Sequence, residues 1–346
     1  MTLPSRPRLA PHRTVLPRGP RRRQVGLDPD TALVVDDLPP ALAQLLDELA
    51  VADDATGPLA RAVARGADPD GARALLAELA AAGAVVDARD VERPADRRRH
   101  STVLVEGSGL LAAGVVTGLV QGGAGVVHVR ATGTVGSADL GTGLVDADLG
   151  RDRVNALVDA ARRLHPGAAV GPPPERSLPD LVVLADAQVP DPALVARLHV
   201  EGLAHLPVRL RDGTGVVGPL VLPGRSACLG CLELHRRARD PGWPAVTAQL
   251  LGREGSGEPE AAAATAALAV AQVLAVLDGG SGHGPADGGD RAAAGAAPPV
   301  LGATLELDLT GGTLLRRPWP AHPDCTCGAP RSETSGLPDG RVTIMG

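Results

Sequence analysis

Hydrophobic and polar positions change their period along the 346-residue chain, and each change marks an expected element. The short apolar run at 31–35 predicts a strand, and helix-spaced apolar positions that open with Pro39 and Pro40 predict a helix after it. Helix spacing followed by a strand returns over residues 68–88. This order predicts a small winged-helix-like α+β domain over residues 25–90.

The segments on either side of this domain show no apolar period. Residues 1–24 are rich in Pro and Arg, so we expect a disordered tail there. Residues 91–100 are charged and predict a linker, and residues 331–346 predict a second tail.

The most regular stretch of the chain begins at residue 101. A buried strand at 102–106, a glycine turn, a helix at 110–123 and a second strand at 125–131 make one βαβ unit, the start of a doubly wound sheet. Further strands and helices continue this pattern. We therefore expect an α/β, Rossmann-like domain over 101–330, with a flexible insertion at 279–298.

A glycine fingerprint of the form G-x-G-x-x-A follows the first strand of that unit. It consists of Gly107, Ser108, Gly109 and Ala112. Such a turn brings the backbone close to a phosphate, or serves only the turn and the packing of helix on strand. A dinucleotide site also needs a carboxylate after the next strand, and Arg130, Ala131 and Thr132 stand there instead. Nucleotide binding by Gly107, Ser108, Gly109 and Ala112 and a purely structural turn thus stay open as alternatives, and a nicotinamide-dependent oxidoreductase is disfavoured.

Four cysteines stand in two tight pairs almost a hundred residues apart. They form C-x-x-C at Cys228 and Cys231 and C-x-C at Cys325 and Cys327. Two such turns supply what a closed four-thiolate zinc site requires, so we expect structural zinc, with a disulfide or redox pair and a metal-free cluster as alternatives. His235 and His322 lie close enough in sequence to replace one thiol.

A basic and aromatic cluster follows the first cysteine pair in "LHRRARDPGWP". It combines Arg236, Arg237 and Arg239 with Trp243. This pattern fits a site for an anionic partner, or a solvated helix with Trp243 in a core.

Composition limits the function classes. The net charge of −6, the two Trp and the absence of Phe and Tyr disfavour a nucleic-acid-binding protein. The Arg-rich start has no apolar core of a secretory signal, and no long uninterrupted apolar stretch predicts a membrane span. We expect a cytoplasmic protein.

The order of these features over residues 100–330 resembles the ThiF/MoeB/HesA family, bacterial relatives of ubiquitin-activating enzymes. The resemblance rests on the glycine fingerprint, the "DLGRDRVNALVDAARRLHP" helix, the "DLVVLADAQ" strand, and the two cysteine pairs with an Ala-rich helix between them. The N-terminal domain resembles, by order and size, the leader-peptide-binding domain of cyclodehydratase partner proteins in azole-modified peptide biosynthesis.

The resemblance implies an adenylation site for ATP and Mg²⁺, and this chain departs from it at several positions. Thr142 or Gly143 stands where the family has an Arg, and Arg153 replaces its Lys. Asp186 matches the metal-binding Asp only with a shift of one residue. Arg153 and Asp186 remain the candidate catalytic residues in a site that is otherwise eroded.

These observations favour a ThiF-like scaffold without full adenylation chemistry. It would bind a precursor or leader peptide, or a partner protein, and present it to a separate ATP-dependent enzyme such as a YcaO-type cyclodehydratase. The Rossmann-like domain would serve docking or homodimer formation. The alternative is an active adenylyltransferase that activates the C-terminus of a carrier protein or peptide.

Overall fold

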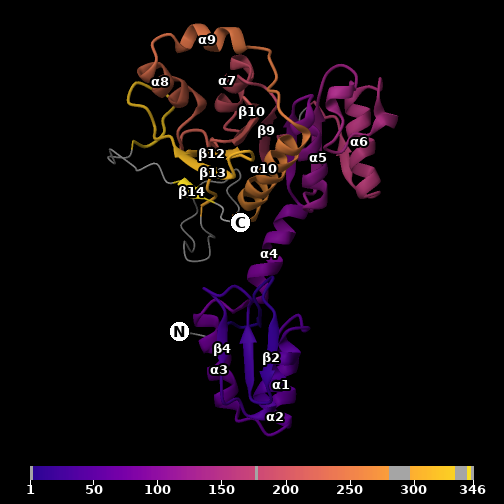
Figure 1. Ribbon diagram of the computed structural model, residues 1–346, viewed down its shortest axis with the longest axis vertical. Helices are drawn as coiled ribbons and strands as arrows, with labels where there is room; N and C mark the ends of the chain where they lie inside the picture. Colours follow the sequence, from indigo (N-terminus) through magenta and orange to yellow (C-terminus); the bar gives the residue numbers. More distant parts are fainter. Residues whose placement is uncertain (1–2, 176–177, 280–296, 332–340, 344–346) are drawn as a thin grey trace. The chain divides into compact units, whose positions relative to one another are not determined.

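The computed structural model describes residues 3–175, 178–279, 297–331 and 341–343. The chain divides into two compact units, residues 1–96 and 97–346, here called unit 1 and unit 2. Helix α4 (Ala88–Arg99) contains the boundary between them and covers most of the expected linker at 91–100. Figure 1 shows the elements of each unit.

Unit 1 is a small winged-helix-like α+β unit with two antiparallel sheets. Its strands are β1 (Pro7–Leu9), β2 (Val15–Gly19), β3 (Arg22–Val25), β4 (Leu33–Val35) and β5 (Val85–Asp87), and its helices before α4 are α1 (Pro40–Leu49), α2 (Thr56–Ala64) and α3 (Pro69–Ala81). β1 pairs with β5, and β2, β3 and β4 form the second sheet in that order. Leu46, Leu76 and Val25 lie in one buried cluster between the helices and strands.

The expectation of a disordered tail over residues 1–24 is wrong for the described residues, because β1, β2 and most of β3 lie there. Few apolar side chains hold these strands. The buried guanidinium of Arg23 instead donates to both carboxylate oxygens of Asp47, with N···O distances of 2.6 and 2.7 Å. Apolar periodicity cannot reveal a strand that is fixed by an ion pair.

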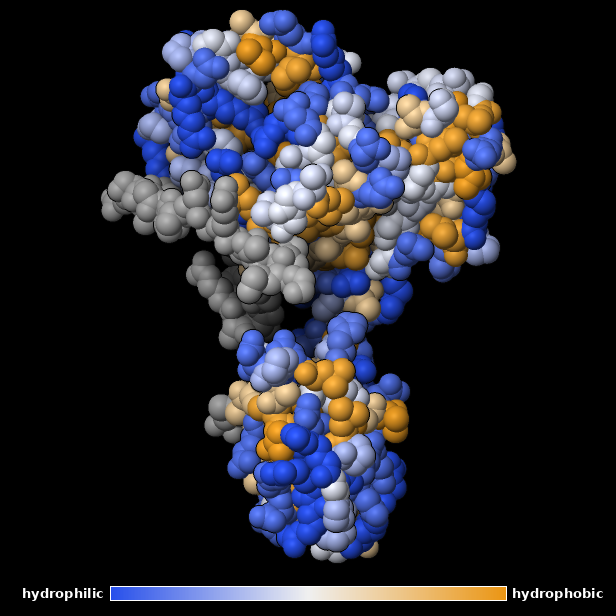
Figure 2. Space-filling model, viewed as in Figure 1, coloured by the Kyte–Doolittle hydropathy of each residue, from blue (hydrophilic) through white to orange (hydrophobic). Residues whose placement is uncertain are grey.

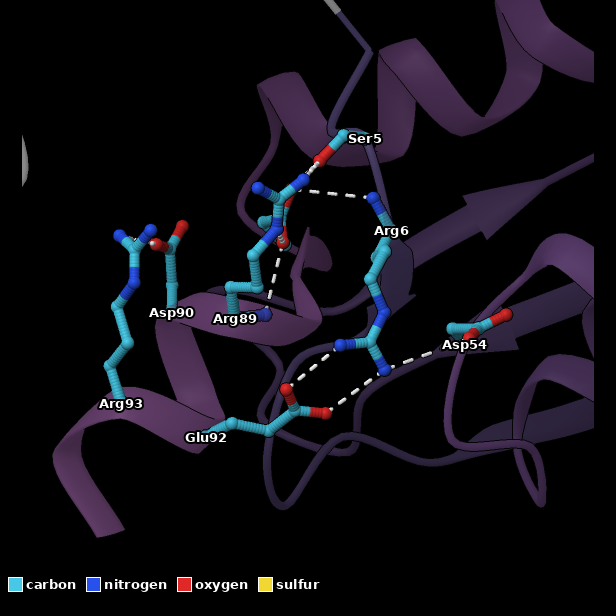
Figure 3. Close-up of polar contacts among 8 residues, drawn as sticks. Ser5, Arg6, Asp54, Arg89, Asp90, Glu92 and Arg93 are labelled. Atoms are coloured by element: carbon cyan, nitrogen blue, oxygen red, sulfur yellow. Dashed lines mark hydrogen bonds and ion pairs between the residues drawn. The ribbon is translucent and has the colours of Figure 1, made fainter. Parts of the chain in front are cut away.

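Polar contacts also hold Ser5 and Arg6 in place (Figure 3). Arg6 donates to the two carboxylate oxygens of Glu92 at 2.8 and 3.1 Å. Ser5 donates its amide and its hydroxyl to Asp87, at 2.9 and 2.7 Å. Partial burial acts to raise the pKa of Asp87, but hydrogen bonds from Ser5 and from the amides of Arg89 and Arg6 outweigh it and lower that pKa to about 2.

Unit 2 is built on one large mixed sheet. Its strands are β6 (Thr102–Glu106), β7 (Val126–Arg130), β8 (Ala169–Gly171), β9 (Leu181–Ala185), β10 (His205–Arg211), β11 (Thr214–Val217), β12 (Ala303–Asp308), β13 (Thr313–Pro318) and β14 (Arg341–Thr343), and its helices after α4 are α5 (Leu110–Gln121), α6 (Arg153–Leu164), α7 (Pro192–Val200), α8 (Leu229–Arg239), α9 (Trp243–Leu250) and α10 (Pro259–Gly279). Among the described residues the strand order is β14-β13-β12-β11-β10-β9-β6-β7-β8. The strands from β8 to β10 run parallel, and β10 to β14 are antiparallel. This is the Rossmann-like sheet that the sequence predicts.

The two faces of this sheet differ in chemistry. One face packs its apolar residues, such as Val105, Val183 and Val208, against α5, α6 and α10 in the largest buried cluster. In Figure 1, α5 lies between α10 and α6. On the other face, α7 covers Val182 and Leu184, whereas the antiparallel strands present charged groups.

Small residues bring α5 and α10 together. A Cβ atom added at Gly114 would lie 2.7 Å from the Cβ of Ala266, and one at Gly118 would lie 2.8 Å from Cγ2 of Val270. Helix α10 is long and apolar enough to cross a membrane, but 56% of its most apolar stretch is buried inside the protein. Its contacts with α5 are those of a core helix in a folded domain.

Two expected irregular segments fall largely outside the described residues. The insertion at 279–298 is described only at its ends, and of the tail at 331–346 the structure describes Arg331 and strand β14, which pairs with β13.

Candidate functional site

The fingerprint loop joins β6 to α5 and lies against the end of β9. A Cβ atom added at Gly107 would lie 2.8 Å from the carbonyl oxygen of Ala185, and one at Gly109 would lie 2.7 Å from Oδ1 of Asp186. Both glycines are therefore required by close packing within the chain. Ser108 Oγ accepts a hydrogen bond of 3.0 Å from the amide of Thr132, which ties the loop to the end of β7.

Asp186 closes this loop from the opposite side. It follows β9 directly and has a φ of 71°, a left-handed conformation that Asp tolerates better than most residues. Its carboxylate accepts hydrogen bonds from the amides of Gly109, Leu111 and Ala112, at 2.9, 2.9 and 3.3 Å. The amides at the N-terminus of α5, where a phosphate would bind, are thus occupied by a carboxylate of the same chain.

Burial governs the charge of Asp186, whose side chain is almost inaccessible to solvent. Burial raises the pKa of this carboxyl to about 6, against the opposing effect of the amides of Gly109 and Leu111, and the nearby Glu254 adds to the rise. The group is therefore mostly ionised at neutral pH and adds negative charge to the loop.

The cations near the fingerprint are also engaged within the chain. Arg153 Nη2 lies 2.8 Å from Oδ2 of the buried Asp139, and Nη1 donates to the carbonyl oxygen of Thr132 at 3.0 Å. Arg130 pairs with Glu106 at 2.7 Å. The structure thus brings Arg153, Asp186 and the fingerprint to one end of the sheet, but each charge has an internal partner.

Thr142, which stands near the position of the family's Arg, is a packing residue here. Its hydroxyl donates to the carbonyl oxygen of Leu110 at 2.6 Å, and its carbonyl oxygen accepts from Thr117 on α5. The loop that would carry a phosphate-binding arginine is thus fastened to the helix.

The four cysteines meet at one point. Cys228 and Cys231 belong to the start of α8, and Cys325 and Cys327 follow β13. The Sγ···Sγ distances are 3.9 Å for Cys228 and Cys231, 3.6 Å for Cys228 and Cys325, and 3.6 Å for Cys231 and Cys327. A tetrahedral ion with metal–sulfur bonds of about 2.3 Å has sulfur–sulfur edges of about 3.8 Å. The S–S bond of a disulfide is only about 2.05 Å long. The four sulfur atoms are therefore spaced for a single metal ion with four thiolate ligands and not for a disulfide.

The two histidines considered as substitutes lie outside this cluster. His235 Nε2 is 2.9 Å from the carbonyl oxygen of Pro320, and His322 Nδ1 accepts from the amide of Asp324 at 3.1 Å. Among the described residues the metal-ligating group consists of the four cysteines alone. The C-x-C turn therefore supplies both of its thiols.

Arg209 was not identified as a candidate site residue from the sequence. Arg209 lies on β10 between Val208 and Leu210 and is only 5% exposed. The available signal was an arginine inside an otherwise apolar strand, "LPVRL", and alternation along that strand directs it away from the α5 face. It lines a cavity beneath α8 and α9.

The sheet order, the fingerprint and the four-cysteine cluster define the class of fold, which is a Rossmann-like fold of the ThiF/MoeB type. Solved structures give the particular likeness. Escherichia coli MccB in complex with MccA superposes with a TM-score of 0.67 at 13% identity, over 94% of this chain and 100% of that chain. E. coli MccB with ATP gives 0.64 at 13% identity, over 93% and 99%.

A second protein shares part of this fold. PaaA superposes with a TM-score of 0.52 at 14% identity, over 71% of this chain and 91% of that chain. No protein-family model matches the sequence, and no curated protein matches it. The likeness is therefore one of fold, with MccB described as the microcin C7 biosynthetic enzyme.

Proposed function

We propose that the chain is a peptide-binding scaffold of ThiF-like fold that does not use ATP. It captures a precursor or leader peptide, or a partner protein, and presents it to a separate ATP-dependent modifying enzyme such as a YcaO-type cyclodehydratase. The observation that carries this proposal is the contact of Asp186 with the amides of Gly109, Leu111 and Ala112. A triphosphate would have to displace a buried carboxylate and replace it with more negative charge.

Two observations support a peptide as the ligand. MccB, which has the same fold, has been solved in complex with N-formylated MccA. In unit 1, β4 pairs only with β3 among the described residues, so its outer edge is open to an added strand. β2, at the other edge of that sheet, contains Pro17, which lacks a donor, so β4 is the better acceptor of a peptide strand.

The cysteine cluster fits zinc, and we assign it a structural role. Cys228, Cys231, Cys325 and Cys327 would hold the ion, which supplies a crosslink and balances the charge of four thiolates. Four protein ligands leave no open position for substrate. The crosslink joins α8 to the segment after β13 and so fixes one wall of the cavities beneath α8 and α9. Unit 2 would also provide the docking or homodimer surface, in a cytoplasmic assembly.

ATP–pyrophosphate exchange on the zinc-loaded chain tests this proposal. We expect no exchange above background with any peptide or carrier protein that ends in glycine. Robust exchange with one such partner would overturn the scaffold function.

The second candidate function is an active adenylyltransferase, and the observation in its favour is that MccB of this fold has been solved with ATP. In that case Arg153 would have to leave Asp139 and Asp186 would have to leave the α5 amides when ATP and Mg²⁺ bind. A structure of the chain with a non-hydrolysable ATP analogue would show both rearrangements, whereas the scaffold function requires neither.

A further inference from the structure

Two neighbouring cavities that share lining residues lie on the α8 and α9 side of unit 2. The first, here called the arginine cavity, has a volume of about 480 Å³. The second, here called the apolar cavity, has a volume of about 870 Å³ and is lined by residues such as Pro207, Val195, Leu232 and Leu251. Both cavities are lined by Gln188, Val189, Arg209, Arg236 and Trp243. A ligand that fills both would have a charged group at one end and an apolar body.

Arg209 and Glu306 are buried charged residues at the wall of the arginine cavity, and of the two only Glu306 forms ion pairs among the described residues. Arg209 is 5% exposed, its Nη2 has no hydrogen-bond partner, and no carboxylate of the described residues forms an ion pair with it. An unpaired charge taken out of water destabilises the folded protein. Such a group is stable only if something compensates for it, and a bound anion does so directly.

The neighbouring carboxylates of Glu233 and Glu306 act on Arg209 at a distance and hold up its pKa, but among the described residues their ion pairs are with other arginines. Glu306 accepts from Arg211 at 2.9 Å and from Arg317 at 3.0 Å. Glu233 pairs with Arg236 at 2.8 Å and also accepts from the indole of Trp243 at 2.6 Å.

The charge balance of the cavity is positive. The arginines at its wall are Arg209, Arg211, Arg236, Arg239 and Arg317, against the carboxylates of Asp212 and Glu306. Burial, together with Arg236 and Arg211, lowers the pKa of Arg209 to about 9, so that it still carries its charge at neutral pH. The cavity therefore attracts an anion.

We propose that the arginine cavity binds a carboxylate carried by an apolar peptide segment, with the carboxylate on the guanidinium of Arg209 and the apolar residues in the apolar cavity. A planar guanidinium matches a carboxylate in two parallel hydrogen bonds. Figure 2 shows apolar residues gathered over α9, and Val246 and Leu251 are the large exposed ones there. This inference rests on the proposed function, because it names the chemistry of the peptide that the scaffold recognises.

The two tryptophans of the chain provide an intrinsic fluorescence probe of the arginine cavity. They are Trp243 and Trp319, both line that cavity, and the chain has no Tyr or Phe. The guanidinium of Arg236 lies 5.1 Å from the ring centre of Trp243 and 5.8 Å from that of Trp319. Intrinsic fluorescence of the full-length protein therefore reports on this site alone.

The test is a fluorescence titration of the zinc-loaded full chain with synthetic pentapeptides. The first is acetyl-Ala-Leu-Val-Leu-Ala with a free carboxylate, and the second is the same peptide with a C-terminal amide. The third, acetyl-Ala-Leu-Glu-Leu-Ala amide, carries its carboxylate on a side chain. We expect one of the two carboxylate peptides to bind at least about 10-fold more tightly than the neutral amide, because only a carboxylate forms a buried ion pair with Arg209.

Each outcome of this titration has a meaning. Preference for the first peptide identifies a chain terminus as the natural ligand, and preference for the third identifies an acidic side chain. Equal affinity for all three overturns the proposal. A fluorescence change with inorganic phosphate but with neither carboxylate peptide also overturns it, because the site would then select a phosphate.

A variant separates binding from structure. In Arg209→Met we expect the preference for carboxylate to vanish while the free protein remains folded, because an apolar side chain replaces an unpaired charge. Arg162→Met, at an exposed position of α6, is the matched control and should keep the preference. Preference that survives in a folded Arg209→Met protein contradicts the proposal. The comparison of free acid with amide on the unmodified chain needs no variant, so it decides the matter if Arg209→Met fails to fold.

The failure of this inference is distinguishable from the failure of the proposed function. ATP–pyrophosphate exchange combined with an Arg209-dependent preference would remove the scaffold function and leave the carboxylate site. No exchange and no preference would remove the carboxylate site alone.

Discussion

Two neighbouring parallel strands, β9 and β10, each place a charged residue at the same end of the sheet. The two charges differ in the partners that they have within the chain. Ala185 pairs with Val208, so Asp186 and Arg209 are the next residues of their strands. Asp186 meets three backbone amides, whereas Arg209 meets no carboxylate among the described residues.

This difference indicates where a ligand is needed. On the fingerprint side, the carboxylate of Asp186 already holds the amides of Gly109, Leu111 and Ala112, and Asp139 holds Arg153, of which only the buried Nε has no partner. The α8 and α9 side is incomplete, because a buried charge there lacks its partner. The buried guanidinium without an ion-pair partner therefore lies beneath α8 and α9, on the face of the sheet away from α5.

Removal of the metal site should have the largest effect on stability, because the four cysteines hold one wall of the cavities beneath α8 and α9, the side on which Arg209 lies. We expect Cys228→Ser to lose its zinc and to destabilise the protein by about 4 kcal/mol or more. Metal content by atomic emission and unfolding by denaturant measure the two effects. Thr326→Ser, at an exposed position between Cys325 and Cys327, should keep both zinc and stability. A metal-free Cys228→Ser protein as stable as the parent would show that the cluster has no structural role.

The satisfied side should depend on Asp186. Asp186→Gly keeps the left-handed backbone but removes the acceptor of three amides, and we expect a loss of about 3 kcal/mol in the free energy of unfolding. The matched control is Asp152→Gly, where an exposed cap serves only the amide of Asn155, and the expected loss is a few tenths of a kcal/mol. Equal losses in the two variants would mean that water replaces the carboxylate without cost.

The same residue should give the protein a pH signature. The pKa of Asp186 is raised in the folded state to about 6, from an unfolded value near 3.8. The folded state therefore binds more protons in this window, and this contribution to stability is present below pH 3.8 and lost as the pH rises through 6. The stability difference between the parent chain and Asp186→Gly should shrink by about 2 kcal/mol from pH 4 to pH 7. A difference that stays constant, or grows, would place the pKa of this carboxyl at or below its ordinary value.

The smallest expected effect is on the stability of the free protein when the unsatisfied charge is removed. Arg209→Met should raise the free energy of unfolding by about 1 kcal/mol, because the protein no longer buries an uncompensated charge. Thermal unfolding without added ligand measures it, with Arg162→Met as the control. A clear loss of stability would assign Arg209 a structural partner and end the contrast with Asp186.

The sequence predicted the parts of this molecule that depend on pattern. The βαβ unit around Gly107 and Gly109 and the meeting of the two cysteine pairs were readable, because glycine spacing and paired thiols have few structural solutions. The strands β1 to β3 were not, since Arg23 and a few apolar residues hold them.

The contacts of Asp186 and the burial of Arg209 could not be predicted from any sequence pattern. The carboxylate of Asp186 reaches the α5 amides because the backbone of Asp186 is left-handed. The spacing of residues in the sequence does not predict this conformation. Burial of Arg209 depends on α8 and α9, which are distant from it in sequence. Both facts arise from tertiary contacts, and together they change the expectation from an eroded ATP site to a filled one.

The most direct test of this account is calorimetric titration of the zinc-loaded full-length chain with Mg·ATP. If Asp186 fills the phosphate position, no binding heat should appear up to about 1 mM ATP, the upper end of ordinary substrate affinities. Saturable binding of one ATP per chain in that range, lost when Arg153 is replaced by Met, would contradict the account and restore the adenylyltransferase.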